Sequence, residues 1–172
     1  MAYNIFIDSD IILDVLLKRV DFYKESYAIV VLCEQEEVIL YTSSSIILNV
    51  QYIGGKISSK KTVAKTIYYL VENFIEVINP TKQTILKAYD SDFSDYEDAI
   101  QYFTAKDSGL IDFFISRNVK DYNKATNALP VLTPIQFLRQ ASKENSNNQT
   151  CFPISFYHLP QAIYLKPLHT HF

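Results

Sequence analysis

The sequence predicts an α/β protein, a three-layer α/β/α sandwich with a mostly parallel central sheet of four or five strands. Two observations lead to this prediction. Short apolar segments alternate with longer segments of helical periodicity. Such alternation is typical of a parallel sheet covered by helices on both faces. Hydrophobic residues make up 48% of the 172 residues and charged residues 20%, which suits one packed domain.

The chain begins with one expected strand and two expected helices. Residues 3–7 are apolar and predict a buried strand that ends at Asp8, and residues 11–18 predict a short helix. Asp21 has the side chain of a helix cap and is expected to open the second helix. Helical spacing places four residues on one face of that helix: Phe22, Ser26, Ile29 and Cys33.

The next segments predict two more strands and two more helices. A strand at 38–41 leads into a third helix, which the serines at 43–45 can cap. We expect the Gly54–Gly55 pair to end that helix near Ile53. Ser58 or Ser59 caps a fourth helix to about Asn73, and a strand follows at 74–78.

The remaining elements continue the alternation. Residues 81–89 predict a helix, and Ser94 or Asp95 opens another that reaches about Lys106. Strands are expected at 113–116 and 131–133. Pro134 suits the first turn of a last helix, to about Ser142.

Charge and cysteine content limit the functions and the cellular compartment that we expect. A net charge of −3 argues against a protein that coats nucleic acid by charge alone, but a bound metal could still supply positive charge to a nuclease. Cys33 and Cys151 form neither a disulfide framework nor a zinc spacing. No basic leader and no membrane-length apolar segment is visible. We therefore expect a cytoplasmic protein with no membrane partner.

Three aspartates follow the first expected strand: Asp8, Asp10 and Asp14. Ligands of open α/β sheets bind outside the carboxyl ends of the strands. A carboxylate at that edge is a ready ligand for Mg²⁺ or Mn²⁺. Alternatively, Asp8 only caps the helix that follows it. The residues by themselves leave both roles open.

Two other polar segments are expected at the same edge. The acidic segment DSDFSDYEDA places Asp95 and Asp98 on one helix face, either as a site or as a solvated helix start. The loop SRNVKDY places Asn118 and Asp121 after the fourth strand, either as ligands or as polar groups facing water. Converging carboxylates without cations cost several kcal/mol when desolvated. A divalent ion would remove that cost, so the three segments together favour a metal site.

Five blocks, in order, resemble the motifs of bacterial PIN domains: FIDSDIILDVLLKR, SSSIILNVQYI, DYEDAIQYFTA, FISRNVKDY and PVLTPIQFL. The resemblance covers roughly residues 3–140. It implies a Mg²⁺- or Mn²⁺-dependent endoribonuclease acting on single-stranded RNA. Many members of the family are the toxin half of a toxin–antitoxin pair, so the implied partners are RNA and an antitoxin protein. A second copy of the chain is a further expected partner, on the grounds given below for the C-terminal residues.

The resemblance also assigns site residues. The family's first acidic ligand falls on Asp8, its central aspartate on Asp98, and its last acidic position on Asn118 or Asp121. Its second acid, usually a glutamate, falls on Asn49, which would weaken the attraction for metal. The expected metal ligands are therefore Asp8, Asp98 and Asp121, with Asp10 and Asp95 as supporting acids and Asn118 orienting a ligand or the substrate. Asp10 stands where the family usually has asparagine, so a carboxylate could have been relocated.

Two alternative interpretations remain. Asp8 and Asp10, two apart after a first strand, also resemble the opening of haloacid-dehalogenase-like phosphatases, with Ser43 as a later motif residue. The other alternative is a PIN scaffold that has lost catalysis and binds RNA or a protein partner, as Asn49 and Asn118 would permit.

The C-terminal residues differ from the rest. We expect a nuclease domain at 1–142 and an arm at 143–172 that is rich in aromatic residues and proline. Lys166 is the only charged residue from Asn145 onward. Because exposed apolar surface is unfavourable, we expect this arm to pack against its own domain or a second copy.

Overall fold

A computed structural model of the protein describes residues 2–147. The chain divides into two units, residues 1–140 and 141–172, and the fold below is that of the first. The prediction of a packed C-terminal arm lies mostly outside the described residues. Its expected start falls inside a helix, because α7 (Pro134–Asn147) continues beyond Ser142. No glycine or proline interrupts the sequence there before Pro153, so nothing stops the helix at Ser142.

All five strands belong to one parallel sheet in the order β3-β2-β1-β4-β5. The strands are β1 (Tyr3–Ile7), β2 (Val38–Ser43), β3 (Ile75–Ile78), β4 (Phe113–Ile115) and β5 (Val131–Leu132). The predicted strands are all present, and the pairing is entirely rather than mostly parallel.

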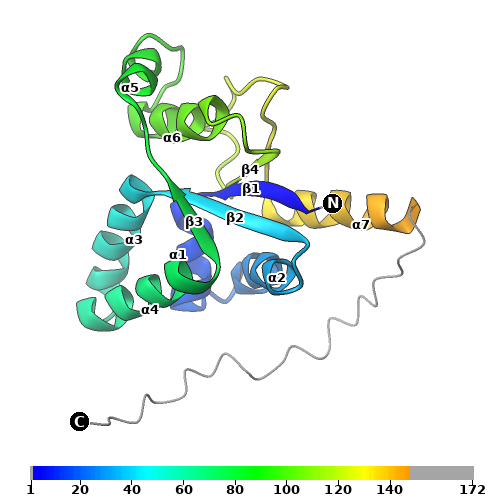
Figure 1. The fold of residues 1–172 in the computed structure, drawn as a ribbon. Coiled ribbons are helices and arrows are strands. Elements are labelled where there is room, and N and C mark those ends of the chain that lie inside the picture. The colour runs from blue at the N-terminus through cyan, green and yellow to red at the C-terminus, as the bar shows by residue number, and fades with distance from the viewer. Residues whose placement is uncertain (1, 148–172) are drawn as a thin grey trace. The chain divides into compact units, whose positions relative to one another are not determined.

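Helices cover both faces of the sheet, as predicted. Figure 1 shows α1 to α4 on one face and α5 and α6 on the other. Their bounds are α1 (Ser9–Leu17), α2 (Tyr23–Glu34), α3 (Ser44–Ile57), α4 (Lys60–Asn73), α5 (Lys82–Tyr89) and α6 (Tyr96–Asp107). The predicted three-layer sandwich is confirmed.

The core is built around β1, which pairs with β2 on one side and β4 on the other. Ile5 and Phe6 have no exposed surface, because helices cover both faces of the strand. The Phe6 ring stacks on Phe114 of β4 with centroids 5.1 Å apart. Apolar burial thus fixes β1 in the middle of the sheet and places its carboxyl end at the centre of one edge.

Side-chain caps set the starts of five helices. Asp8, Ser43, Ser59, Thr81 and Asp95 each accept a hydrogen bond from a backbone N–H of the helix that follows. Unpaired N–H groups at a helix start need such acceptors. Capping residues are the reason that several helix starts could be read from the sequence.

The prediction that Asp21 caps the second helix is wrong. Helix α2 starts at Tyr23, and its capping position is Phe22, which makes no side-chain cap. The Arg19 carbonyl accepts hydrogen bonds from the N–H groups of Phe22 (3.0 Å) and Tyr23 (2.7 Å). A backbone turn therefore satisfies the donors that Asp21 was expected to satisfy.

The prediction that Gly54 and Gly55 end the third helix is also wrong, because α3 continues through both to Ile57. Gly54 is buried, and a Cβ atom added there would lie 3.1 Å from Cγ1 of Val63 on α4. Contacts between α3 and α4 therefore account for this glycine, and its cost to helix stability is only about 1 kcal/mol.

Within the described residues, no helix combines the length and the apolar character needed to cross a bilayer.

We predict that Gly54→Leu lowers the free energy of unfolding by about 1–3 kcal/mol, because the added side chain would overpack the contact with Val63. The matched control is Leu48→Ala on the same helix, where the side chain is 69% exposed and the change should stay within about 0.5 kcal/mol. Urea denaturation measures both. Equal stability of Gly54→Leu and the parent would contradict the packing role.

Candidate functional site

Asp8 stands where β1 passes into α1. Its backbone N–H donates to the Ile115 carbonyl at 3.0 Å, which continues the pairing of β1 with β4. Its Oδ1 accepts from the Ser9 N–H at 2.6 Å and so caps α1. Its Oδ2 accepts a hydrogen bond from the Tyr122 hydroxyl at 3.1 Å. Asp8 therefore caps α1 through Oδ1, a role that the sequence left open. Its other carboxylate oxygen, Oδ2, contacts Tyr122.

Asp98 reaches the same hydroxyl from the first turn of α6. Its Oδ1 accepts from the Tyr122 hydroxyl at 3.3 Å. Asp95 fixes the start of this helix, because its Oδ1 accepts from the N–H groups of Glu97 (2.7 Å) and Asp98 (3.2 Å). Residues that lie ninety positions apart in the sequence, Asp8 and Asp98, thus converge on one point.

Asp121 and Asn118 lie in the loop after β4, the neighbour of β1 in the sheet. The Asn118 side-chain amide donates a hydrogen bond to Oδ2 of Asp121. The Asn118 backbone N–H donates to the Ser116 hydroxyl at 3.1 Å, which fixes the loop to the end of the strand. Asn118 therefore orients Asp121 in this structure.

The carboxylates influence one another electrostatically. Burial, followed by the charges of Asp8, Asp95 and Asp121, raises the pKa of Asp98 to about 6, and the Tyr122 hydrogen bond acts in the opposite direction. Burial and the charges of Asp8 and Asp98 raise the pKa of the Tyr122 phenol well above its ordinary value. Negative charge is thus concentrated at this edge of the sheet.

Asp10 turns toward a cation instead. Its Oδ2 accepts from the Arg117 backbone N–H at 2.8 Å and lies 3.5 Å from Nε of the same arginine. That Nε also lies 3.2 Å from Oδ2 of the buried Asp14. Burial and the charge of Asp8 raise the pKa of Asp10 to about 7, although Arg117 opposes the shift. The supporting acid expected from the sequence thus holds the Arg117 loop.

Asn49, where the resemblance predicts an acidic residue, has an acidic neighbour. Its side-chain amide donates to Oε1 of Glu97 on α6 at 3.2 Å. Glu97 precedes Asp98 and was not singled out by the sequence, since the contact joins residues on two helices. Negative charge is therefore present close to position 49 in spite of the asparagine.

Within residues 2–147, no three His, Cys, Asp or Glu side chains are already arranged as an assembled metal site. The structure instead brings Asp8 and Asp98 to one hydroxyl and leaves Asp121 on the adjoining loop. The charge of Asp121 still contributes to the raised pKa of Asp98. Asp10 and Asp95 make other contacts.

Comparisons with known proteins agree with this fold. The PIN domain family model matches residues 4–120. Ribonuclease VapC1 of Aquifex aeolicus is 32% identical over 111 residues, which is 62% of this chain and 76% of the relative. This chain belongs to the PIN-domain family.

Solved structures of low sequence identity share the PIN fold. Mycobacterium tuberculosis VapC20, described as a toxin that cleaves the sarcin–ricin loop, has a TM-score of 0.58 at 10% identity, over 73% of this chain and 98% of its own. VapBC2 of Rickettsia felis, bound to a promoter DNA fragment, has a TM-score of 0.54 at 15% identity, over 76% and 98%. The predicted family is confirmed, and the phosphatase alternative is set aside.

Ser43, the later motif residue of the phosphatase alternative, has another role in the PIN fold. Its hydroxyl caps α3 by accepting from the Ile46 N–H at 3.2 Å and donates to Oε1 of Gln101 at 2.6 Å. Gln101 in turn donates to the Ser45 hydroxyl at 2.9 Å. This buried network joins α3 to α6 across the end of β2 and helps to place Asp98.

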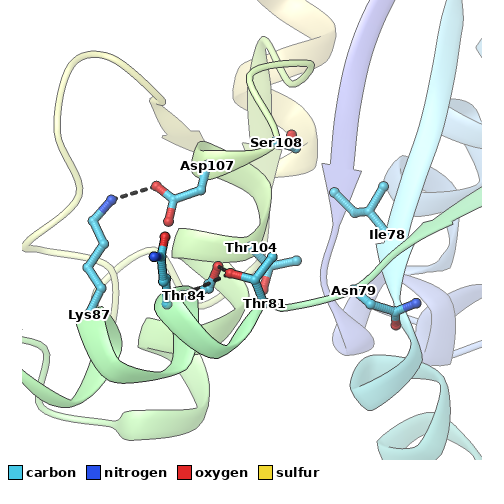
Figure 2. Close-up of a pocket in the computed structure, with 9 residues that line it drawn as sticks. Ile78, Asn79, Thr81, Thr84, Lys87, Thr104, Asp107 and Ser108 are labelled. Atoms are coloured by element: carbon cyan, nitrogen blue, oxygen red, sulfur yellow. Dashed lines mark hydrogen bonds and ion pairs between the residues drawn. The ribbon is translucent and has the colours of Figure 1, made fainter.

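A separate pocket of about 630 Å³ lies beside α5 and α6. Figure 2 shows Thr81, Thr84 and Thr104 beside it, Lys87 joined to Asp107 at one side, and Ile78 and Asn79 across from them. The Lys87–Asp107 pair, 2.5 Å apart, already balances the charges of that pocket. None of the expected metal ligands lines it, so it is distinct from the carboxylate edge.

We predict that Asp98→Asn raises stability above about pH 6 in metal-free buffer. The folded pKa of Asp98 is about 6 and the ordinary value 3.8, so folding binds a proton between these values and stability falls as pH rises through them. The gain near pH 7 should be on the order of 1 kcal/mol after solvent screening, and it should vanish below about pH 4.

Chemical denaturation across this pH range provides the measurement. Asp92→Asn, which removes an exposed acid of the same segment, is the control and should show no such pH-dependent gain. If the parent and Asp98→Asn were equally stable at pH 7, burial and the neighbouring carboxylates would not disfavour the charged form of Asp98 as the structure indicates.

Proposed function

We propose that this PIN-domain protein is an endoribonuclease that needs Mg²⁺ or Mn²⁺ and cleaves single-stranded RNA at the carboxyl edge of its sheet. The convergence of Asp8 and Asp98 on the Tyr122 hydroxyl is the observation that supports it most directly. The similarity to a protein named as a ribonuclease supports the reaction class.

The donor set suits a hard divalent cation. Asp8, Asp98 and Asp121 offer carboxylate oxygens, which Mg²⁺ and Mn²⁺ prefer over nitrogen or sulfur. Among the ion pairs between described residues, none includes these three acids, since Arg117 pairs with Asp10 and Asp14. Burial and then the charges of neighbouring acids raise the pKa of Asp98, and a cation would offset the repulsion among these acids.

The residues of the proposed site have separate roles. Asp8, Asp98 and Asp121 would hold one or two ions, and Asn118 keeps Asp121 in position through its side-chain amide. When bound, such an ion polarises the phosphoryl oxygens and lowers the pKa of the attacking water. Asp95 supports the site by capping α6, and Asp10 supports it by holding Arg117.

Glu97 compensates for Asn49 in this proposal. Its carboxylate lies 3.2 Å from the Asn49 amide, so it adds negative charge near the place where the family's second acid would stand. The exposed position of Glu97 on the first turn of α6 leaves it accessible to water and to an ion.

The biological setting follows from the relatives. The structures with the same fold include toxin–antitoxin complexes, so we propose that the chain is the toxin of such a pair and works in the cytoplasm with an antitoxin partner. RNA is the proposed substrate, and a second copy of the chain is a further expected partner.

We predict that Asp8→Asn reduces RNA cleavage more than about 100-fold, because even residues that only support metal ligands contribute about 10–100-fold. The assay uses labelled single-stranded RNA with Mg²⁺ or Mn²⁺, and excess chelator should abolish cleavage by the parent. Asp92→Asn is the matched control and should cleave like the parent.

Two outcomes would contradict the proposal. Cleavage by Asp8→Asn at the parent rate would place the activity elsewhere. Binding of RNA without cleavage in either metal would support the alternative of a PIN scaffold that has lost catalysis, as Asn49 permits.

A further inference from the structure

We propose that Tyr122 is a positioning residue, whose hydroxyl sets the spacing of Asp8 and Asp98 and thereby the affinity of the site for a divalent cation. The inference rests on the proposed metal site. It adds to that site a residue that is not one of the candidate acids. Tyr122 directly follows Asp121, and its importance is not visible from the order of residues alone.

The Tyr122 side chain is a fixed point in the structure. It is only 3% exposed, and its ring packs on Phe114 of β4 with centroids 4.7 Å apart and on Phe93 at 6.3 Å. Its backbone is anchored as well, since the carbonyl accepts from the Ala125 N–H at 2.9 Å. A rigid ring holds the hydroxyl in place at the carboxyl edge of the sheet.

The two acids that contact this hydroxyl belong to elements that are far apart in the sequence. Asp8 belongs to the β1–α1 junction and Asp98 to the first turn of α6. The hydroxyl lies 3.1 Å from Oδ2 of Asp8 and 3.3 Å from Oδ1 of Asp98, so the two acids share its one proton. It is the shared contact through which the position of one carboxylate constrains the other.

A hydroxyl is suited to this task because it is neutral. A phenol with an ordinary pKa of about 10 keeps its proton at neutral pH. It can orient the carboxylates without cancelling their charge, as a lysine or arginine would do. Each carboxylate has about four lone-pair sites, so one contact with the hydroxyl leaves the others for an ion.

Tyr122→Phe is the direct test, because it keeps the ring that packs on Phe114 and removes only the hydroxyl. We expect the dissociation constant for Mn²⁺, measured by calorimetry, to rise about 10–100-fold, as is typical when a group that orients metal ligands is lost. If RNA cleavage is measured too, raising the Mn²⁺ concentration should restore the activity lost by Tyr122→Phe at low Mn²⁺.

Tyr102→Phe is a matched control. Tyr102 is also fully buried, and its hydroxyl binds the same stretch of chain after β4, donating to the Leu129 carbonyl at 3.2 Å and accepting from the Thr126 N–H at 2.8 Å. It contacts neither Asp8 nor Asp98 through a hydrogen bond of the described residues. This variant should lose stability but bind Mn²⁺ within about threefold of the parent, well below the range expected for a lost orienting group.

The outcomes of these measurements distinguish the proposed metal site from the positioning role of Tyr122. Unchanged or tighter Mn²⁺ binding by Tyr122→Phe overturns the positioning role alone. Equal weakening by Tyr122→Phe and Tyr102→Phe overturns it too, because loosening of the loop would then be the cause. No Mn²⁺ binding by the parent overturns the metal site and the positioning role with it.

A measurement on the parent keeps the proposal testable if Tyr122→Phe does not fold. Titration with Mg²⁺ should shift the NMR signals of the Tyr122 ring, since an ion bound to Asp8 and Asp98 changes what its hydroxyl contacts. Shifts at the acids without any at Tyr122 would overturn the proposal.

Discussion

Strand β1 occupies the middle of the sheet, and its pairing with β2 and β4 fixes the point from which the site is built. Ile5 and Phe6 are buried on its two faces, and the backbone pairing with β2 and β4 sets its register. The strand therefore ends at Asp8, which caps α1 while remaining bonded to β4 through its backbone N–H. The loop with Asp121 follows β4, so the same pairing brings it to this edge.

The acidic residues at the carboxyl edge of the sheet lie in two different electrostatic environments. Asp10 and Asp14 share Arg117, whose guanidinium also lies 4.0 Å from the centre of the Phe22 ring. Asp8 and Asp98 share only a neutral hydroxyl, and no ion pair of the described residues includes them. Desolvated like charges cost free energy unless a cation offsets them. Within the described residues, Asp10 and Asp14 thus have a cationic partner, whereas Asp8 and Asp98 have none, which is the arrangement that the proposed metal site requires.

The sequence predicted the strands well, because short buried apolar segments between polar ones leave few alternatives, and it predicted most helix starts from their caps. It singled out Asp8 and Asp98 but not the hydroxyl that both contact. The bonding role of the Tyr122 hydroxyl was not predicted, because its partners lie 24 and 114 positions away in the sequence. Gly54 was misinterpreted because packing against Val63, rather than a helix end, requires it. Local patterns show strands and caps, whereas contacts between distant elements require the fold.

Paramagnetic NMR with Mn²⁺ tests most directly whether the carboxylate edge is a cation site. Small additions of Mn²⁺ to the parent broaden the amide signals of residues close to the bound ion. The account predicts that Asp8, Asp98 and Asp121 lose intensity first, while residues near the Lys87–Asp107 pair remain sharp. Broadening centred on α5, or spread evenly over the surface, would contradict it.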